Sequence, residues 1–175
     1  MKFIETALKG ALIIHPELVE DERGFFARTF CRNEFAARGL NPELVQCSIS
    51  FNRKKGTIRG MHLQLPPCEE IRLVRCTRGA IYDVIVDLRS ESPTFRKWIA
   101  AELTEANRHQ LYVPAGFAHG FQTLGDDCEV FYQMTEFYAP QYSFGVRFDD
   151  PALKIDWPQP VTVISARDRS YPDLG

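Results

Sequence analysis

Short runs of β-branched and aromatic residues, separated by turn-forming residues, limit the fold of this chain more than any other feature. The clearest run is Ala80–Leu88, which follows Gly79. The one helix signal begins with Asn33 as a cap, extends through Arg38 and ends at Gly39. Many short strands with regularly spaced turns are typical of a sandwich or a barrel, and barrels can hold a small ligand. We therefore predict an all-β fold, a single β-barrel domain over residues 1–175 with a few short helices. Other predicted strands cover residues 72–76, 110–113, 129–134 and 143–148, and further β-type runs occupy 11–14 and 24–30.

Side chains alternate between the two faces of a strand, and this gives the run Ala80–Leu88 an unusual face. One face carries Ile81, Asp83, Ile85 and Asp87, and the other carries Tyr82, Val84, Val86 and Leu88. Two carboxylates beside isoleucines are unusual in a dry core. We expect this face to form the wall of a polar cavity.

The composition excludes several classes of protein. Of 175 residues, 45% are hydrophobic and 25% are charged, as in an ordinary globular domain, and the net charge of −2 gives no basic stripe for nucleic acid or an anionic membrane. The five cysteines are odd in number and lack CxxC spacing, so neither a disulfide framework nor a zinc site is predicted. No signal peptide or membrane span is recognisable. We expect a cytoplasmic protein with reduced cysteines.

The segment from Arg59 to Gln64 is the first candidate for chemistry. If it is extended, Gly60, His62 and Gln64 face one way and Arg59 faces the other. His62 is then either a structural histidine or a catalytic base. A metal site is disfavoured because cupin-type sites need a second histidine where this chain has Gln64.

Three further groups each have two interpretations. His119, between Gly116 and Gly120, could be a structural residue at a barrel corner or a site residue, and the glycines permit a bend and close backbone approach. Tyr132 and Tyr138 are either core residues or groups that donate a proton and stack on a base. Asp168 is a solvated turn residue unless the C-terminal segment folds back onto the barrel.

Six segments, in order along nearly the whole chain, resemble the dTDP-4-dehydrorhamnose 3,5-epimerase family. The resemblance implies a cupin-like jelly-roll β-barrel, a homodimer, and no metal or nicotinamide cofactor. It implies a nucleotide-diphospho-sugar substrate carrying a 4-keto-6-deoxyhexose. The segments are Asp21–Phe26, Gly56–His62, Ser92–Phe95, Pro114–Phe121, Asp156–Pro158 and Ser165–Asp168.

The resemblance also assigns roles to residues of the site. His62 is the base that removes a proton next to the ketone, Asp168 orients its imidazole, and Tyr132 is the acid that returns a proton from the opposite face. Histidine suits this task because its ordinary pKa of about 6.5 lies near neutrality. His119 and Asp83 match a second, supporting pair. The residues that match the family's nucleotide-binding positions are Arg23, Gln46, Arg59 and, for stacking, Tyr138. In the family the N-terminal strand crosses to the partner subunit, so the sites are expected to be shared.

Three positions depart from the family pattern. Arg72 stands where the family has a lysine near the developing enolate; it keeps the positive charge but is bulkier and does not release a proton, so one inversion instead of two is a hypothesis. Arg28 replaces a glutamate that accepts from thymine, and it could instead donate to cytosine or guanine. Ser48 replaces an asparagine nearby.

The leading prediction is therefore an isomerase that inverts C3 and C5 of dTDP-4-dehydro-6-deoxyglucose. The alternatives are a 3-only or 5-only epimerase on a CDP- or GDP-linked sugar, a non-catalytic sugar-nucleotide-binding cupin, and a metal-dependent cupin oxygenase. Retention of His62, Tyr132 and Asp168 argues against the non-catalytic protein.

Overall fold

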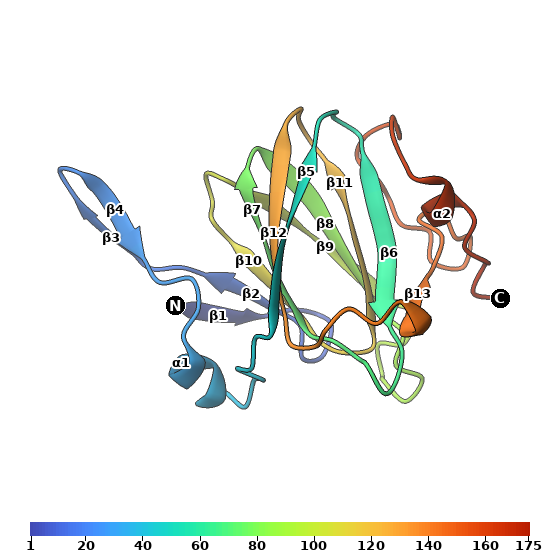
Figure 1. Ribbon diagram of the computed structural model, residues 1–175, viewed down its shortest axis with the longest axis horizontal. Coiled ribbons are helices and arrows are strands. Elements are labelled where there is room, and N and C mark those ends of the chain that lie inside the picture. The colour runs from blue at the N-terminus through green and yellow to red at the C-terminus, as the bar shows by residue number, and fades with distance from the viewer.

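Two antiparallel sheets, facing each other, form the body of the computed structural model, which describes residues 1–175 (Figure 1). The order in the six-stranded sheet is β1 (Lys2–Glu5), β2 (Leu12–His15), β10 (Gln110–Val113), β7 (Arg72–Arg78), β12 (Cys128–Met134) and β5 (Gln46–Asn52). The order in the five-stranded sheet is β13 (Ser143–Gly145), β6 (Ile58–Gln64), β11 (Phe117–Thr123), β8 (Ala80–Asp87) and β9 (Trp98–Thr104). The predicted all-β jelly-roll barrel is thereby confirmed.

The main core lies between the two sheets. Ile81 and Ile85 of β8 pack there with Val74 of β7 and Phe121 of β11, all fully buried. Val84 and Val86 point to the other side of β8, into a second cluster closed by the C-terminal part of the chain. The two predicted faces of β8 are therefore confirmed.

The prediction of a polar cavity wall on β8 is wrong for Asp87. This buried carboxylate accepts hydrogen bonds from Arg89 Nη2 at 2.8 Å, Ser92 Oγ at 2.5 Å and Thr94 Oγ1 at 2.6 Å. Burial acts to raise the pKa of Asp87, but these donors outweigh it and hold the pKa well below the ordinary value. Asp87 closes a turn, and it takes no part in the pocket described below.

Helix α1 (Arg32–Ala36) begins earlier than predicted, and Asn33 is not its cap. The N-cap residue is Cys31, whose side chain makes no capping hydrogen bond. Buried Phe35 explains the difference, because its ring packs against Phe3 and Tyr112 and fixes the helix by tertiary contact.

Three smaller features complete the fold. Strands β3 (Leu18–Asp21) and β4 (Gly24–Ala27) form a hairpin arm that extends away from the barrel and exposes Val19 and Phe26 (Figure 1). The predicted strand over 143–148 ends earlier, as β13, and follows the turn η1 (Pro140–Tyr142). The short helix α2 (Ala166–Arg169) lies beside β6. No helix is long and apolar enough to cross a membrane.

Candidate active site

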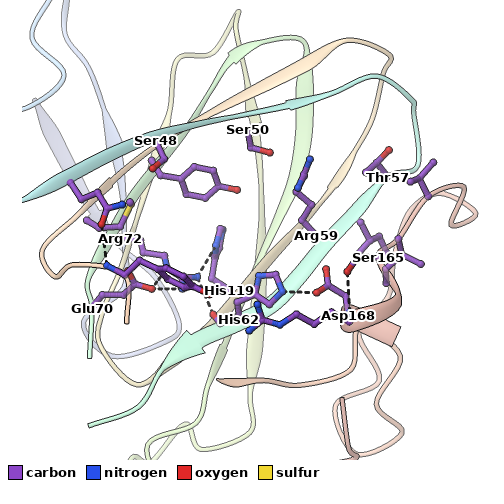
Figure 2. A pocket seen from close by; sticks show the side chains of 18 residues that line it. Ser48, Ser50, Thr57, Arg59, His62, Glu70, Arg72, His119, Ser165 and Asp168 are labelled. Carbon is purple, nitrogen blue, oxygen red and sulfur yellow. Dashed lines mark hydrogen bonds and ion pairs between the residues drawn. The ribbon is translucent and has the colours of Figure 1, made fainter. Parts of the chain in front are cut away.

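A cavity of about 690 Å³ opens where the two sheets and the C-terminal segment meet (Figure 2). Strands β5, β7 and β12 of one sheet and β6 and β11 of the other supply its walls, and residues 163–168 close one side. Nine of the twelve predicted site residues line it. They are Gln46, Ser48, Arg59, His62, Arg72, His119, Tyr132, Tyr138 and, from α2, Asp168.

His62 and Asp168 form the first hydrogen-bonded His–Asp pair of the cavity, and they come from positions 106 residues apart. His62 Nε2 lies 2.8 Å from Asp168 Oδ1, and Asp168 Oδ2 accepts from the backbone N–H of Gly60 at 3.2 Å. The His62 side chain is 33% exposed and that of Asp168 is 6% exposed. Burial acts to raise the pKa of Asp168, but the contacts with His62, Gly60 and Ser165 outweigh it and lower the pKa. An ionised Asp168 fixes a proton on Nε2 and leaves Nδ1 of His62 as the nitrogen with a free lone pair.

The C-terminal segment reaches the cavity because it runs back along β6. Thr57 and Val163 form a parallel bridge, and Ile58 N–H donates to the Val163 carbonyl at 2.9 Å. Ser165 then caps α2 by accepting from the backbone N–H of Asp168 at 3.0 Å. The C-terminal segment therefore folds back onto the barrel, which was the condition for Asp168 to be more than a turn residue.

The prediction that Arg59 and His62 face opposite ways is wrong, because both side chains line the cavity. The pairing of β6 with β11 is irregular here, because His62 is opposite His119 and Arg59 is opposite Phe121. Between these two pairings β6 contains one residue more than β11, as in a β-bulge. Gly60 and Gly120 make this possible, since a Cβ on Gly60 would lie 2.5 Å from Gly120 Cα. The expected close backbone approach at Gly120 is confirmed.

His119 and Asp83 form a second hydrogen-bonded pair, which is buried. His119 Nε2 lies 2.6 Å from Asp83 Oδ1, and the two side chains are 3% and 0% exposed. On the other side of the ring, Arg72 Nη1 lies 3.4 Å from His119 Nδ1. Because a guanidinium only donates, Nδ1 accepts and Nε2 carries the proton toward Asp83. Both nitrogens of His119 are therefore occupied.

Arg72 is held by a residue that the sequence interpretation missed. Glu70 Oε1 accepts from Arg72 Nε at 2.9 Å and also from Nη2, while Arg72 Nη1 donates to the His62 carbonyl at 2.9 Å (Figure 2). Residues 70 and 72 are two apart at the start of a predicted strand, so their shared face was the signal that could have revealed the pair.

Tyr132 stands on β12, in the sheet opposite His62. Its ring meets that of His119 edge-on, with centroids 6.0 Å apart. Burial, and then the charge of Asp83, raises the pKa of Tyr132, so its hydroxyl keeps its proton at neutral pH. Ser48 lies directly opposite Tyr132 on β5.

Tyr138, Gln46 and Arg167 also line the cavity. Tyr138 is exposed, and its backbone N–H donates to Gln46 Oε1 at 3.0 Å. Arg167 of α2 lines the same cavity and was missed, although its position beside Asp168 in the segment Ser165–Asp168 was a signal for it. Its Nη2 donates to Ser143 Oγ at 2.8 Å.

Arg23 and Arg28 are not at this cavity in the single chain. Both belong to the arm and its base: Arg23 pairs with Asp21, and Arg28 Nη1 lies 3.3 Å from Glu34. Asp83 does not line the cavity either but supports His119 from behind. No three His, Cys, Asp or Glu side chains gather in a way that could hold a metal ion.

Comparisons with known proteins give one consistent family. The family model described as dTDP-4-dehydrorhamnose 3,5-epimerase matches residues 5–175. A dTDP-4-dehydrorhamnose 3,5-epimerase of Sinorhizobium fredii is 43% identical, over 99% of this chain and 90% of that relative. The crystal structure of one from Elizabethkingia anophelis has a TM-score of 0.96 at 40% identity, over 99% of this chain and 96% of that chain. One from Bacillus anthracis, with TDP and PPi bound, has a TM-score of 0.95 at 41% identity and covers 99% of both chains.

Proposed function

Because the chain belongs to the dTDP-4-dehydrorhamnose 3,5-epimerase family, we propose that it inverts C3 and C5 of dTDP-4-dehydro-6-deoxyglucose, with His62 as base and Tyr132 as acid. One observation supports these roles. His62, on one sheet and oriented by Asp168, lies across the cavity from Tyr132, a protonated tyrosine on the other sheet. The alternatives of a non-catalytic protein and of a metal-dependent oxygenase find no such support.

Proton removal begins at a carbon next to the C4 ketone, because the resulting negative charge moves to the ketone oxygen as an enolate. Nδ1 of His62 takes the proton, and the imidazolium that forms is stabilised by Asp168 at 2.8 Å. The N–H of Gly60 holds the carboxylate in place, so the base keeps its orientation through the step.

Inversion requires that a proton return to the opposite face of the same carbon. Tyr132 is suited to this task because its raised pKa keeps the phenol protonated, and because β12 places it across the cavity from β6. Donation of that proton to the enolate carbon restores the ketone with the opposite configuration. Release of the proton from His62 to water and uptake of a proton by Tyr132 then restore both groups.

Arg72 supplies the positive group nearest to both histidines. Four of its five N–H groups are already directed at Glu70, the His62 carbonyl and His119, which leaves one Nη2 N–H for the enolate oxygen. A preorganised donor of this kind stabilises charge that develops in the transition state.

We propose that Arg59 and Arg167 bind the diphosphate and that Tyr138 stacks on the base, with Gln46 and Ser48 beside it. Arg23 and Arg28 then come from the arm of a second subunit in a homodimer. The exposed apolar side chains of the arm, among them Val19 and Phe26, support this arrangement. Light scattering coupled to size exclusion would test it, and a monomer that is fully active would contradict it.

The function is tested by proton NMR in D₂O. The enzyme is mixed with a 4-keto-6-deoxyglucose linked to dTDP, CDP or GDP. Deuterium entering both C3 and C5 of the dTDP form confirms the proposal. Exchange at one carbon only would implicate Arg72, and a preference for CDP or GDP would implicate Arg28. No exchange with any of the three would overturn the substrate class.

A further inference from the structure

Glu70 is the one acidic residue that points into the cavity without a histidine as its partner. Its side chain is only 9% exposed, and Oε1 takes both hydrogen bonds from Arg72. No hydrogen bond reaches its second carboxylate oxygen. A carboxylate that is nearly buried in this way needs a cationic partner, and Arg72 is that partner.

The pair fixes Arg72 in one orientation. Nε and Nη2 face Glu70, and Nη1 is thereby turned toward the His62 carbonyl at 2.9 Å and His119 Nδ1 at 3.4 Å. The planar fork of a guanidinium transmits such a constraint from one edge to the other. Glu70 therefore determines which donors of Arg72 face the sugar end of the cavity.

The rest of the cavity explains why such a restraint matters. Arg59 and Arg167 also line it, so the walls carry three guanidinium groups. A nucleotide diphosphate is a strong and bidentate partner for any of them. Arg72, on a long flexible side chain, would turn toward the diphosphate if nothing held it.

We propose that Glu70 is a positioning residue for the epimerisation: it neutralises Arg72 and restrains it at the sugar end of the cavity, away from the diphosphate. The inference rests on the proposed function and extends it. Glu70 lowers the affinity for the nucleotide and in return keeps Arg72 beside the reacting carbons. The two effects have opposite signs, and a residue with only a structural role would not produce both.

The test compares Glu70→Gln with Glu69→Gln. Both variants remove one carboxylate, but Glu69 is exposed and makes no side-chain hydrogen bond. Calorimetry measures the Kd for dTDP, and deuterium exchange into the dTDP-linked 4-keto sugar gives kcat. For Glu70→Gln we expect dTDP to bind about tenfold more tightly, because a negative charge is removed from the cavity and Arg72 is free to turn toward the diphosphate. We expect kcat to fall about tenfold or more, because Arg72 is no longer held.

Two results complete the test. Glu70→Asp retains the charge, and we expect its dTDP affinity to stay near that of the wild type; Glu69→Gln changes neither quantity. If Glu70→Gln binds dTDP no more tightly than the wild type, the inference is overturned, whatever happens to kcat. If the wild type itself exchanges no deuterium, the proposed function fails instead, and the dTDP affinities still decide whether Glu70 restrains Arg72.

Discussion

The two His–Asp pairs of this protein are built from the same groups but are suited to different tasks. His62–Asp168 is partly open to the cavity, whereas His119–Asp83 is buried. His62 has one nitrogen occupied by its carboxylate and one free, whereas His119 has Arg72 on its second nitrogen. The difference teaches that a carboxylate partner alone does not make a histidine a base. A base also needs a ring nitrogen without a partner, and of the two histidines His62 has one.

The largest effect is expected for His62→Ala. Without the base, deuterium exchange at C3 and C5 should fall by roughly 10²–10⁴-fold or more. Proton NMR in D₂O measures it. His15→Ala is the matched control, because His15 lies far from the cavity and stacks on His109. If His62→Ala retained exchange within threefold or so of the wild type, the comparison between the pairs would be wrong.

Substitution in the buried His119–Asp83 pair should lower the stability of the fold. His119→Ala leaves Asp83 buried with no donor on Oδ1, and its Oδ2 already lacks a partner. Removing one member of a buried pair typically lowers the free energy of unfolding by about 3–5 kcal/mol. Urea denaturation measures it, with His62→Ala as the control, and we expect the control to lose much less. Equal losses in the two variants would remove the distinction between the pairs.

The sequence predicted the strands better than it predicted how the cavity is closed. The alternating residues of β8 place Asp83 on the correct face of the strand, because strand periodicity is local, but Asp83 lies behind His119 and not in the cavity wall. The joint placement of Arg59 and His62 was not predictable, since it depends on one extra residue in β6 opposite Gly120. A bulge of this kind is a tertiary feature, and it reverses every alternation beyond it.

Contacts between distant segments account for the other omissions. Arg167 reaches the cavity only because the chain after Val163 runs beside β6, and no periodicity in the sequence encodes that path. The resemblance to the family assigned Asp168 to the site, whereas the residue pattern alone left it as a turn residue. Arg23 lies on the arm and Arg28 at its base, away from the cavity, so the roles proposed for them require a second subunit.

Tyr132→Phe sharpens the comparison from the other side of the cavity. It removes the returning proton but leaves the His62–Asp168 pair intact, so inversion should fall by about 10²-fold while exchange falls less. NMR follows deuterium uptake and the new configuration in one sample. Tyr142→Phe, outside the cavity, is the control. Equal loss of exchange and inversion would count against Tyr132 as the acid.

The smallest effect concerns Asp168 and acid stability. The pKa of Asp168 is lowered in the folded protein, so the carboxylate stabilises the fold above the ordinary aspartate pKa of about 3.9, and this contribution is lost as the pH falls through the folded value. Asp168→Asn lacks the contribution at every pH. The difference in unfolding free energy between the two proteins should therefore be largest near pH 6 and should shrink below about pH 4.

Urea denaturation at several pH values measures that difference, and comparing wild type with variant cancels other acidic groups such as Asp87. The same variant sharpens the comparison of the two pairs. Asp168→Asn keeps the shape of the contact but can present its amide N–H to Nε2, which moves the ring proton to Nδ1, the nitrogen that we propose as the base. Exchange should then fall although the fold is only slightly weakened. Full exchange in this variant would mean that the orientation of His62 does not depend on Asp168. His62 paired with Asp168 would then be no better a base than an isolated histidine.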